Sequence, residues 1–428
     1  MPDYLFLIES RLSPDQWQVV QRMQQAARSL GMNLYLVGGA VRDLIGGFPI
    51  EDLDFVAEGK ALKLLRALSQ GQARALWQND SLQEAEIEFP TGVLASLCMA
   101  RSETYAKPAA APAIAPATIL DDLRRRDFSI NAISISLNPH SLGLLLDPTN
   151  GVADIAKKEI RTLRSSSFLE DPIRMFRAVR LRTRLGFSLD PKTATQLQNA
   201  LEEEVWEKIS GEDLARELRQ IARERDPAEV LQALEKEGLL AALSPHLRKK
   251  GLDLPVFARA SKSRQALDEA GFHVRSFPLL LHLLTRRLSS PERTQLAKRL
   301  NLKRPEIEAW RRLEEDTKRL AQELVGKAMD APVKLYQRLA AIPPEQIQLL
   351  LVESSDRKVH SRVKTYLQRY LPLRSSLPVE ELRELGVASE TPRHQKILET
   401  YFHALLEGKL RTRSEQVKFL KKIVQEVK

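Results

Sequence analysis

The hydrophobic pattern of the chain changes near Pro148, and this change limits which folds the chain can adopt. Residues 1–145 mix strand-like runs with helical runs. From Leu169 onward, most windows repeat their apolar residues at helical spacing, with prolines and glycines between them. Strands confined to one part of a chain and helices to the rest are typical of the α+β class. The sequence therefore predicts an α+β protein whose head contains a mixed β-sheet with helices, followed by an elongated all-α part.

The expected domain boundaries follow these shifts in pattern. The head is predicted over residues 1–145 and a helical neck over residues 146–235. A helical body is expected over residues 236–330 and a helical tail over residues 331–428.

The charge balance favours a polyanionic partner. The chain has 428 residues, a formal net charge of +10 and an isoelectric point near 9.5. Nucleic acid is the leading candidate for such a basic protein. The alternative is a soluble basic protein with no partner of this kind, because net charge by itself does not select one.

Cysteine usage and hydropathy indicate the cellular compartment. Cys98 is the single cysteine, which excludes an intrachain disulfide and a cysteine-cluster metal site. The apolar stretch at the N-terminus is too short and too acidic for a signal peptide, and no later segment approaches a membrane-spanning length. The sequence predicts a cytoplasmic protein without a membrane partner, and no feature of it sets the oligomeric state.

Two aspartates, Asp52 and Asp54, follow closely on a diglycine, Gly38-Gly39. In a strand, residues i and i+2 point to the same face, so both carboxylates are expected to converge on one cation. Mg²⁺ prefers such oxygen ligands and often completes its shell with substrate phosphates. Glycine lets a phosphate approach the backbone closely, and Arg42 is near enough in sequence to pair with it. The order of these residues predicts a metal-dependent nucleotide site, whereas each motif alone would be read as a loop acid or a turn.

A second group of polar residues begins with a run of three arginines that ends at Arg126, followed by Asp127 and Asn131. Arginine offers a planar fork of donors that suits phosphate, and the Asp and Asn side chains can accept from a ribose hydroxyl. The segment is a candidate for binding the sugar and phosphates of a nucleotide. The alternative is a surface cluster of ion pairs.

A third group, Asp171, Arg174, Arg177 and Arg180, recurs every three residues on a helix that Pro172 can begin. These residues form one ridge with apolar neighbours on both sides, unlike an ordinary solvated face. We expect the arginines to line a cleft. The apolar neighbours are Ile173, Phe176 and Val179 on one side and Met175, Ala178 and Leu181 on the other.

The chemistry of this ridge suggests which base it could recognise. Cytosine and adenine present an amino donor beside a ring-nitrogen acceptor, whereas guanine and uracil present the reverse pattern. A carboxylate only accepts and a guanidinium only donates, so Asp171 with Arg174 would accept C and A and reject G and U. Arg177 and Arg180 could then contact phosphate or hold the acid in place.

Together these motifs resemble the class II tRNA nucleotidyltransferase and bacterial poly(A) polymerase family, which includes the enzymes that build or repair the CCA end of tRNA. Their order and spacing are specific to this family and cover roughly residues 30–190. The matching segments are Gly38 to Asp43 with Asp52 to Asp54, Arg125 to Ala132, Asp147 to Ile155, and Glu170 to Arg174.

The resemblance implies a role for each matching residue. Asp52 and Asp54 would be catalytic and would hold Mg²⁺ as the cofactor. The head would contain the triphosphate site, the neck the base-recognition helix, and the tail a tRNA-binding surface. The implied nucleotide-binding residues are Gly38, Gly39 and Arg42 for the triphosphate, Arg126, Asp127 and Asn131 for the sugar side, and Asp171, Arg174, Arg177 and Arg180 for the base and phosphates.

Two departures from the family pattern affect these expectations. Ser96 precedes Arg101 where many relatives carry an acid, which leaves a third metal carboxylate to Glu86 or Glu88. The loop over residues 101–118, expected to be mobile, lacks the arginine-rich signature associated with enzymes that add all three nucleotides. This second departure favours C addition alone.

The activity implied by the resemblance is Mg²⁺-dependent attack of the tRNA 3′-hydroxyl on the α-phosphorus of CTP or ATP, with release of pyrophosphate and without a nucleic-acid template. One alternative is a poly(A) polymerase on the same scaffold. Another is a noncatalytic RNA-binding protein, since Ser96 and Asp213 both stand where the family usually has other residues.

Overall fold

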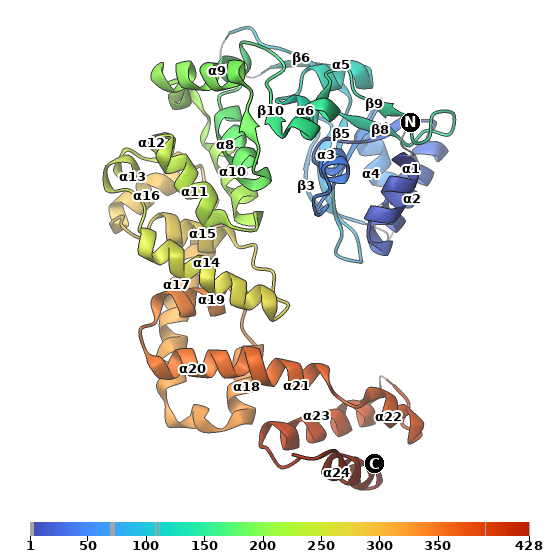
Figure 1. Cartoon of the computed structure of the whole chain (residues 1–428), viewed down its shortest axis with the longest axis vertical. Coiled ribbons are helices and arrows are strands. Elements are labelled where there is room, and N and C mark those ends of the chain that lie inside the picture. The colour runs from blue at the N-terminus through green and yellow to red at the C-terminus, as the bar shows by residue number, and fades with distance from the viewer. Residues whose placement is uncertain (1–3, 69–72, 108, 111, 390, 428) are drawn as a thin grey trace. The chain divides into compact units, whose positions relative to one another are not determined.

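The structure is a computed structural model that describes residues 4–68, 73–107, 109–110, 112–389 and 391–427 (Figure 1). The chain divides into two compact units. The first contains residues 1–213 and 237–242, and the second contains residues 214–236 and 243–428. The finer division into head, neck, body and tail stays a prediction.

The first unit is built on a seven-stranded mixed sheet with the strand order β3-β4-β5-β2-β1-β8-β9. The pairing of β2 with β5 is parallel, and the other neighbours in the sheet are antiparallel. This arrangement confirms the predicted α+β class. The strands are β1 (Leu34–Val37), β2 (Leu53–Ala57), β3 (Arg74–Asn79), β4 (Glu84–Glu88), β5 (Leu94–Met99), β8 (Ser134–Ser136) and β9 (Leu145–Leu146).

The two faces of the sheet differ along β4 and β5. Ala85, Ile87 and Leu97 are buried, and α4 (Ala61–Leu68) packs against these two strands. The alternate residues of β4, including Glu86, remain partly exposed. Because strand side chains alternate between faces, one face of this region is covered by a helix and the other carries polar groups.

Further helices and two small ribbons complete the first unit. β10 pairs in parallel with β11, and β6 pairs antiparallel with β7. The elements are α1 (Tyr4–Arg11), α2 (Pro14–Ser29), α3 (Gly38–Gly46), β6 (Arg101–Thr104), β7 (Ala113–Pro116), α5 (Ile119–Arg124), η1 (Ser129–Asn131), α6 (Gly151–Lys157), β10 (Glu159–Ile160), α7 (Ser167–Glu170), α8 (Arg174–Leu185), β11 (Ser188–Leu189), α9 (Pro191–Glu202), η2 (Val205–Lys208) and α10 (Gly211–Arg223), inside which the boundary with the second unit falls.

The segment predicted as a loop over residues 101–118 contains the β6–β7 ribbon instead of irregular chain throughout. β7 ends at Pro116, which lacks a backbone N–H. Proline is tolerated here because β7 pairs with β6 alone and takes no part in the seven-stranded sheet. Residues 108 and 111 of this segment lie outside the described part of the chain.

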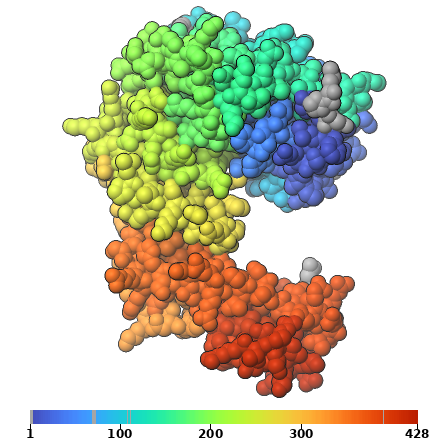
Figure 2. All heavy atoms as spheres, viewed as in Figure 1, coloured from blue at the N-terminus to red at the C-terminus, as the bar shows by residue number. Residues whose placement is uncertain are grey.

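The second unit is helical, as predicted for the C-terminal part of the chain (Figure 1). Figure 2 shows the heavy atoms of the same chain, with its C-terminal part in orange to red. Its α15 is buried on nearly every side and packs against α17, which in turn packs against α19. The helices that follow α10 are α11 (Pro227–Lys236), α12 (Leu240–Leu243), α13 (Pro245–Lys250), α14 (Leu254–Glu269), α15 (Phe277–Leu284), α16 (Ser290–Arg299), α17 (Arg304–Val325), η3 (Lys327–Asp330), α18 (Pro332–Ala340), α19 (Pro344–Glu353), α20 (Arg357–Thr365), η4 (Tyr366–Tyr370), α21 (Leu371–Ser375), α22 (Val379–Glu384), α23 (Pro392–Leu406) and α24 (Arg413–Glu426).

No helix among the described residues combines the length and the apolar character needed to cross a bilayer.

Candidate active site

The diglycine lies directly against Asp54. β1 ends at Val37, and Gly38 begins α3 with φ +63°, a backbone conformation that favours glycine. A Cβ atom on Gly38 would lie 3.0 Å from Arg126 Nη1 and 3.4 Å from Asp54 Oδ2, and one on Gly39 would lie 3.2 Å from the same oxygen. Because glycine has no side chain, space is left beside the Asp54 carboxylate and the Arg126 guanidinium.

Asp54 is held by groups on both sides. The Ser96 hydroxyl donates to Asp54 Oδ1 at 2.7 Å, and the Ala40 N–H donates to Asp54 Oδ2 at 3.4 Å. Asp54 pairs with Ser96 across the parallel β2–β5 register, and Ser96 pairs with Glu86 on β4. Ser96 thus donates a hydrogen bond to the carboxylate, at the position where many members of the family that the sequence resembles carry an acid.

Two carboxylates, those of Asp52 and Asp54, are the candidate ligands for Mg²⁺. Asp52 immediately precedes β2 instead of lying within it, and its Oδ1 atom is buried. In the described part of the chain, no group of three or more Asp, Glu, His or Cys residues is arranged to hold a metal ion, so neither Glu86 nor Glu88 completes such a group. Mg²⁺ commonly binds through one or two carboxylates together with substrate phosphates. Asp52 and Asp54 supply the donor type that this mode requires, and their metal-binding role stays a prediction.

Arg126 lies on the other side of the diglycine. Its Nε and Nη2 atoms donate to Asp122 Oδ2 at 3.2 and 2.9 Å, and its Nη1 donates to the Asn131 carbonyl at 3.3 Å. Burial opposes its charge, but the carboxylates of Asp122 and Asp54 raise the pKa of Arg126. A permanently charged guanidinium is therefore fixed beside Gly38, where an anionic ligand would meet it.

Arg42 is more buried than the sequence suggested. Its side chain is 4% exposed and donates to both oxygens of Asp43, at 2.8 and 3.0 Å. Its Nη1 donates to Asn131 Oδ1 at 2.7 Å, and Arg184 also pairs with Asp43 at 2.7 Å. These contacts orient Arg42 next to Gly39, and its contact with a triphosphate stays a prediction.

Asp127 is held in its ionised form. Its Oδ1 accepts from the Phe128 N–H at 2.8 Å and from Asn131 Nδ2 at 3.1 Å. Arg177 lies 3.6 Å from Oδ2. Burial opposes ionisation, but Arg177 and Arg174 outweigh it and lower the pKa of Asp127. Arg177 thus contacts the acid of the second sequence motif, a contact that the sequence analysis did not predict.

The predicted arginine ridge is present, with one correction. α8 begins at Arg174, so Asp171 lies in the connection between α7 and α8 and not on the helix. Pro172 and Ile173 form a turn that starts the helix two residues later than the proline suggested. The pairing survives, because Arg174 Nε lies 3.3 Å from Asp171 Oδ2.

Burial along α8 agrees with the ridge pattern. Arg174 is 3% exposed, whereas Arg177 and Arg180 are partly exposed. A cleft beside these arginines stays a prediction. The apolar flanks are all buried, namely Ile173, Phe176 and Val179 on one side and Met175, Ala178 and Leu181 on the other.

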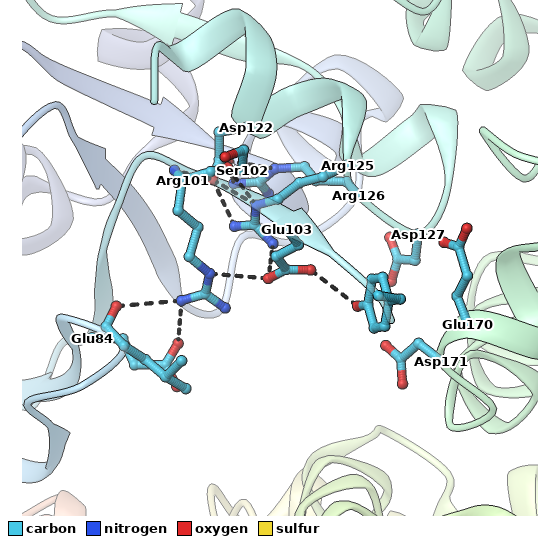
Figure 3. Close-up of polar contacts among 12 residues, drawn as sticks. Glu84, Arg101, Ser102, Glu103, Asp122, Arg125, Arg126, Asp127, Glu170 and Asp171 are labelled. Carbon is cyan, nitrogen blue, oxygen red and sulfur yellow. Dashed lines mark hydrogen bonds and ion pairs between the residues drawn. The ribbon is translucent and has the colours of Figure 1, made fainter. Parts of the chain in front are cut away.

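A network of charged residues connects these groups, and the sequence analysis missed it (Figure 3). Glu103 Oε1 accepts from Arg101 Nε at 3.0 Å and from Arg125 Nη1 at 2.8 Å. Arg125 also pairs with Asp122 at 2.6 Å, the same carboxylate that holds Arg126. The alternation of Arg101 and Glu103, which places two charges on one face of a strand, was the available signal.

Tyr105 continues this network toward Asp171 and Arg174. Its hydroxyl donates to Glu103 Oε2 at 3.1 Å. Burial and the charge of Glu103 raise the pKa of Tyr105, with a further contribution from Asp171, while Arg174 opposes them. The segment between β6 and β7 is tied to α7 by a hydrogen bond of 3.0 Å from the Ala109 N–H to the Leu169 carbonyl. The contacts of Arg42 with Asn131 and of Arg177 with Asp127 join the three sequence motifs.

Comparisons with known proteins show what this chain is similar to. The poly(A) polymerase head domain family matches residues 34–161. The A-adding tRNA nucleotidyltransferase of Geobacter sulfurreducens is 28% identical over 409 residues, which are 91% of this chain and 45% of that protein. The CC-adding tRNA nucleotidyltransferase of Deinococcus radiodurans is 38% identical over 169 residues, which are 39% of this chain and 45% of that protein. This chain thus spans about half the length of these relatives.

A solved structure of a CCA-adding enzyme in its apo form matches along nearly the whole chain. The TM-score is 0.56 at 26% sequence identity, covering 98% of this chain and 99% of the other. The likeness extends beyond the head into the helical unit. The chain is thus similar over residues 34–161 to the poly(A) polymerase head domain family, and over most of its length to tRNA nucleotidyltransferases.

Proposed function

We propose that this protein is a template-independent RNA nucleotidyltransferase that adds C, A or both from CTP and ATP to the 3′ end of tRNA. Its partners are then tRNA and the two nucleotides, and its compartment is the cytoplasm. One observation carries the proposal: Asp54 Oδ2 and Arg126 Nη1 both lie beside Gly38, at 3.4 and 3.0 Å from the position that a Cβ atom on this residue would take. A carboxylate for a cation and a guanidinium for phosphate meet there, which a nucleoside triphosphate with its metal requires.

In this proposal the tRNA 3′-hydroxyl attacks the α-phosphorus in line, and pyrophosphate leaves. Bound Mg²⁺ at Asp52 and Asp54 would favour deprotonation of the hydroxyl and neutralise charge on the phosphates. Gly38 and Gly39 leave space for the triphosphate, and Arg126 offsets its charge. The role of Asp54 is to supply oxygen ligands, and Ser96 and Ala40 orient that carboxylate for it.

Base selection would come from Asp171 and Arg174. The carboxylate accepts a hydrogen bond from the amino group of cytosine or adenine, and the guanidinium donates to the neighbouring ring nitrogen. Guanine and uracil would place a carbonyl against Asp171 and an N–H against Arg174, which leaves buried polar groups unsatisfied. Arg174 also donates to Ser167 Oγ at 2.9 Å, which keeps its plane in one orientation.

How many nucleotides are added depends on features outside this pair. The composition of residues 101–118 favours C addition alone. A addition is the second candidate, because the Geobacter sulfurreducens relative that spans 91% of this chain is named A-adding. Asp171 and Arg174 fit both bases, so they are compatible with either product.

The test is incorporation of each labelled nucleotide into tRNA transcripts that end before, within and after CCA. C addition alone predicts labelling by CTP of the transcript that lacks CCA, and no labelling by ATP of any transcript. A addition predicts labelling by ATP of the transcript that ends in CC. Long products with ATP alone would identify a poly(A) polymerase. No incorporation by the purified full chain with Mg²⁺ would contradict the activity.

A further inference from the structure

Trp77 is a large aromatic residue exposed on β3, the edge strand of the main sheet. It is 40% exposed, and the neighbouring Leu76 is 43% exposed. A single exposed apolar residue is ordinary. Trp77 differs from an ordinary exposed residue because it lies in the same cross-strand row as Asp54.

A β-bulge sets that position. Ala75 pairs with Ile87, and the next paired residue on β3 is Trp77, which lies opposite Glu86. Leu76 is therefore the extra residue. Regular alternation would place Leu76 opposite Glu86 and turn Trp77 to the face that α4 covers. The bulge instead places Trp77 on the polar face, an effect that bulges commonly have next to active sites.

Trp77 then lies in one row with the candidate metal ligand. Successive cross-strand partners are Trp77, Glu86, Ser96 and Asp54, on β3, β4, β5 and β2. The hydrogen bond from Ser96 to Asp54 shows that these two side chains share a face. At about 4.8 Å between strands, the backbones of Trp77 and Asp54 are separated by roughly 14 Å. That distance corresponds to a few nucleotides of single-stranded RNA.

The row extends to the side of Asp54 away from the groups proposed to hold the triphosphate. Gly38 follows β1, and Arg126 contacts Asn131, which precedes β8, so both belong to the β1–β8 side of the sheet. In an in-line displacement the attacking oxygen and the leaving group lie on opposite sides of the phosphorus. The β5–β4–β3 side is thus the side available to the RNA acceptor.

The charges around Trp77 suit a base better than a phosphate. Glu88 pairs with Arg74 at 2.6 Å, and Glu84 pairs with Arg101 at 3.1 Å. The nearby acids are thus partly neutralised, and the arginines are already occupied. An exposed indole offers a flat surface on which any base can stack.

We propose that Trp77 is a stacking platform for an unpaired nucleobase near the 3′ end of the RNA acceptor. This inference rests on the proposed function and adds a binding subsite to it. The platform would direct the single-stranded end from the sheet edge along the row toward Asp54. Stacking is tolerant of sequence, so the subsite would contribute affinity for an unpaired end and not base selection.

The test compares Trp77→Ala with the wild-type full chain on two RNAs, a tRNA transcript with unpaired 3′ nucleotides and the same acceptor stem with a blunt end. Alanine substitution at stacking sites costs about 1–3 kcal/mol per base. We therefore expect the Kd for the unpaired end to rise about 5- to 150-fold and the Kd for the blunt stem to stay the same. The KM for the nucleotide should not change, because the nucleotide binds on the other side of Asp54.

Two further variants control for folding and for simple loss of apolar surface. Trp77→Phe keeps an aromatic face and should retain most of the affinity. Leu76→Ala removes a similarly exposed side chain from the same bulge and should leave RNA binding unchanged. Equal thermal melting curves for the three variants would show that the edge strand still folds.

An active wild type with unchanged acceptor affinity in Trp77→Ala would overturn the inference. A change in oligomeric state without loss of RNA affinity would also overturn it, since it would identify the sheet edge as a contact between copies of the chain. If the wild type incorporates no nucleotide, the proposed function fails on its own. The Kd comparison still decides whether Trp77 binds an unpaired RNA end.

Discussion

Buried ionisable residues occur in both units, but they make different contacts. In the first unit, Asp122 and Arg174 are buried, and Asp122 pairs with Arg126, which lies next to Gly38 and near Asp54. In the second unit, His282 on α15 lies 3.0 Å from Glu353 on α19 and 3.6 Å from Glu314 on α17. The first set surrounds a candidate ligand site, whereas the second links packed helices.

This difference teaches that burial of a charge does not by itself identify function. A buried polar or charged group is costly unless it has a partner, and both sets have partners. In the first set, Arg126 lies next to Gly38, which has no side chain, and near the candidate metal ligand Asp54. The comparison therefore predicts that variants in the first unit alter chemistry or base choice, and that variants of the second set alter stability alone.

Asp54→Asn should have the largest effect on catalysis. The substitution keeps the size of the side chain but removes the charge that a divalent cation needs, which is worth several kcal/mol in the transition state. We expect kcat to fall by about 10³-fold or more. Incorporation assays measure this loss, and a thermal melt within 2 °C of wild type would show an intact fold. Asp80→Asn, an exposed aspartate between β3 and β4, is the control, and substantial activity in Asp54→Asn would refute the metal-binding role.

Asp122→Asn should have the largest effect on stability. Asp122 is fully buried and pairs with Arg125 at 2.6 Å and Arg126 at 2.9 Å. Removing one partner of a buried pair costs about 3–5 kcal/mol. Denaturant unfolding should detect this loss, and exposed Asp121→Asn should change stability by less than about 1 kcal/mol.

The Asp122 effect should also depend on pH. Burial opposes ionisation, but Arg126 and Arg125 lower the pKa of Asp122 below its ordinary value of 3.8. Because folding lowers this pKa, the ionised carboxylate stabilises the folded state at any pH above the ordinary pKa of an aspartate. This stabilisation disappears as the pH falls through the lowered pKa. The difference in the free energy of unfolding between wild type and Asp122→Asn should therefore be largest at neutral pH and should decrease in acid. A difference that stays constant down to the lowest pH at which the protein folds would contradict this account.

His282→Leu tests the second unit. The substitution removes the hydrogen bond to Glu353 and the 3.6 Å contact with Glu314. Each of these glutamates retains an arginine, Arg286 at 2.7 Å from Glu353 and Arg293 at 3.0 Å from Glu314. We expect a loss of roughly 1–3 kcal/mol in the free energy of unfolding. The ratio of C to U incorporation should not change. A change in that ratio would break the distinction between the units, and exposed His273→Leu is the matched control.

Asp171→Ala should have the smallest effect on stability but should relax base choice. It removes the acceptor proposed for the amino group of cytosine or adenine, and a hydrogen bond to a charged group is worth about 1.5–3 kcal/mol. Discrimination of CTP against UTP should fall by roughly 10- to 100-fold. Glu170→Ala, whose carboxylate pairs with Arg164 at 2.8 Å, is the neighbouring control. Unchanged discrimination would count against base recognition by Asp171.

Several elements could be predicted because their cause is local. The helix that begins at Pro14 and the β4–β5 hairpin follow from capping, turn residues and apolar spacing. The apolar flanks of the arginine ridge were also expected from helical spacing and are buried. The start of α8 was less predictable, because two residues after Pro172 form a turn before regular helix begins.

The sequence by itself determined the α+β class, the diglycine before a strand with an acid, and the spacing of the arginines on α8. These features depend on residues near one another in the chain. Only the tertiary structure decided that Ser96 donates to Asp54, that Arg42 is occupied by Asp43 and Asn131, and that a bulge places Trp77 in the row of Asp54. The reason is physical: cross-strand register and contacts between loops bring together residues far apart in sequence, and spacing within one segment does not specify which distant partner each side chain meets.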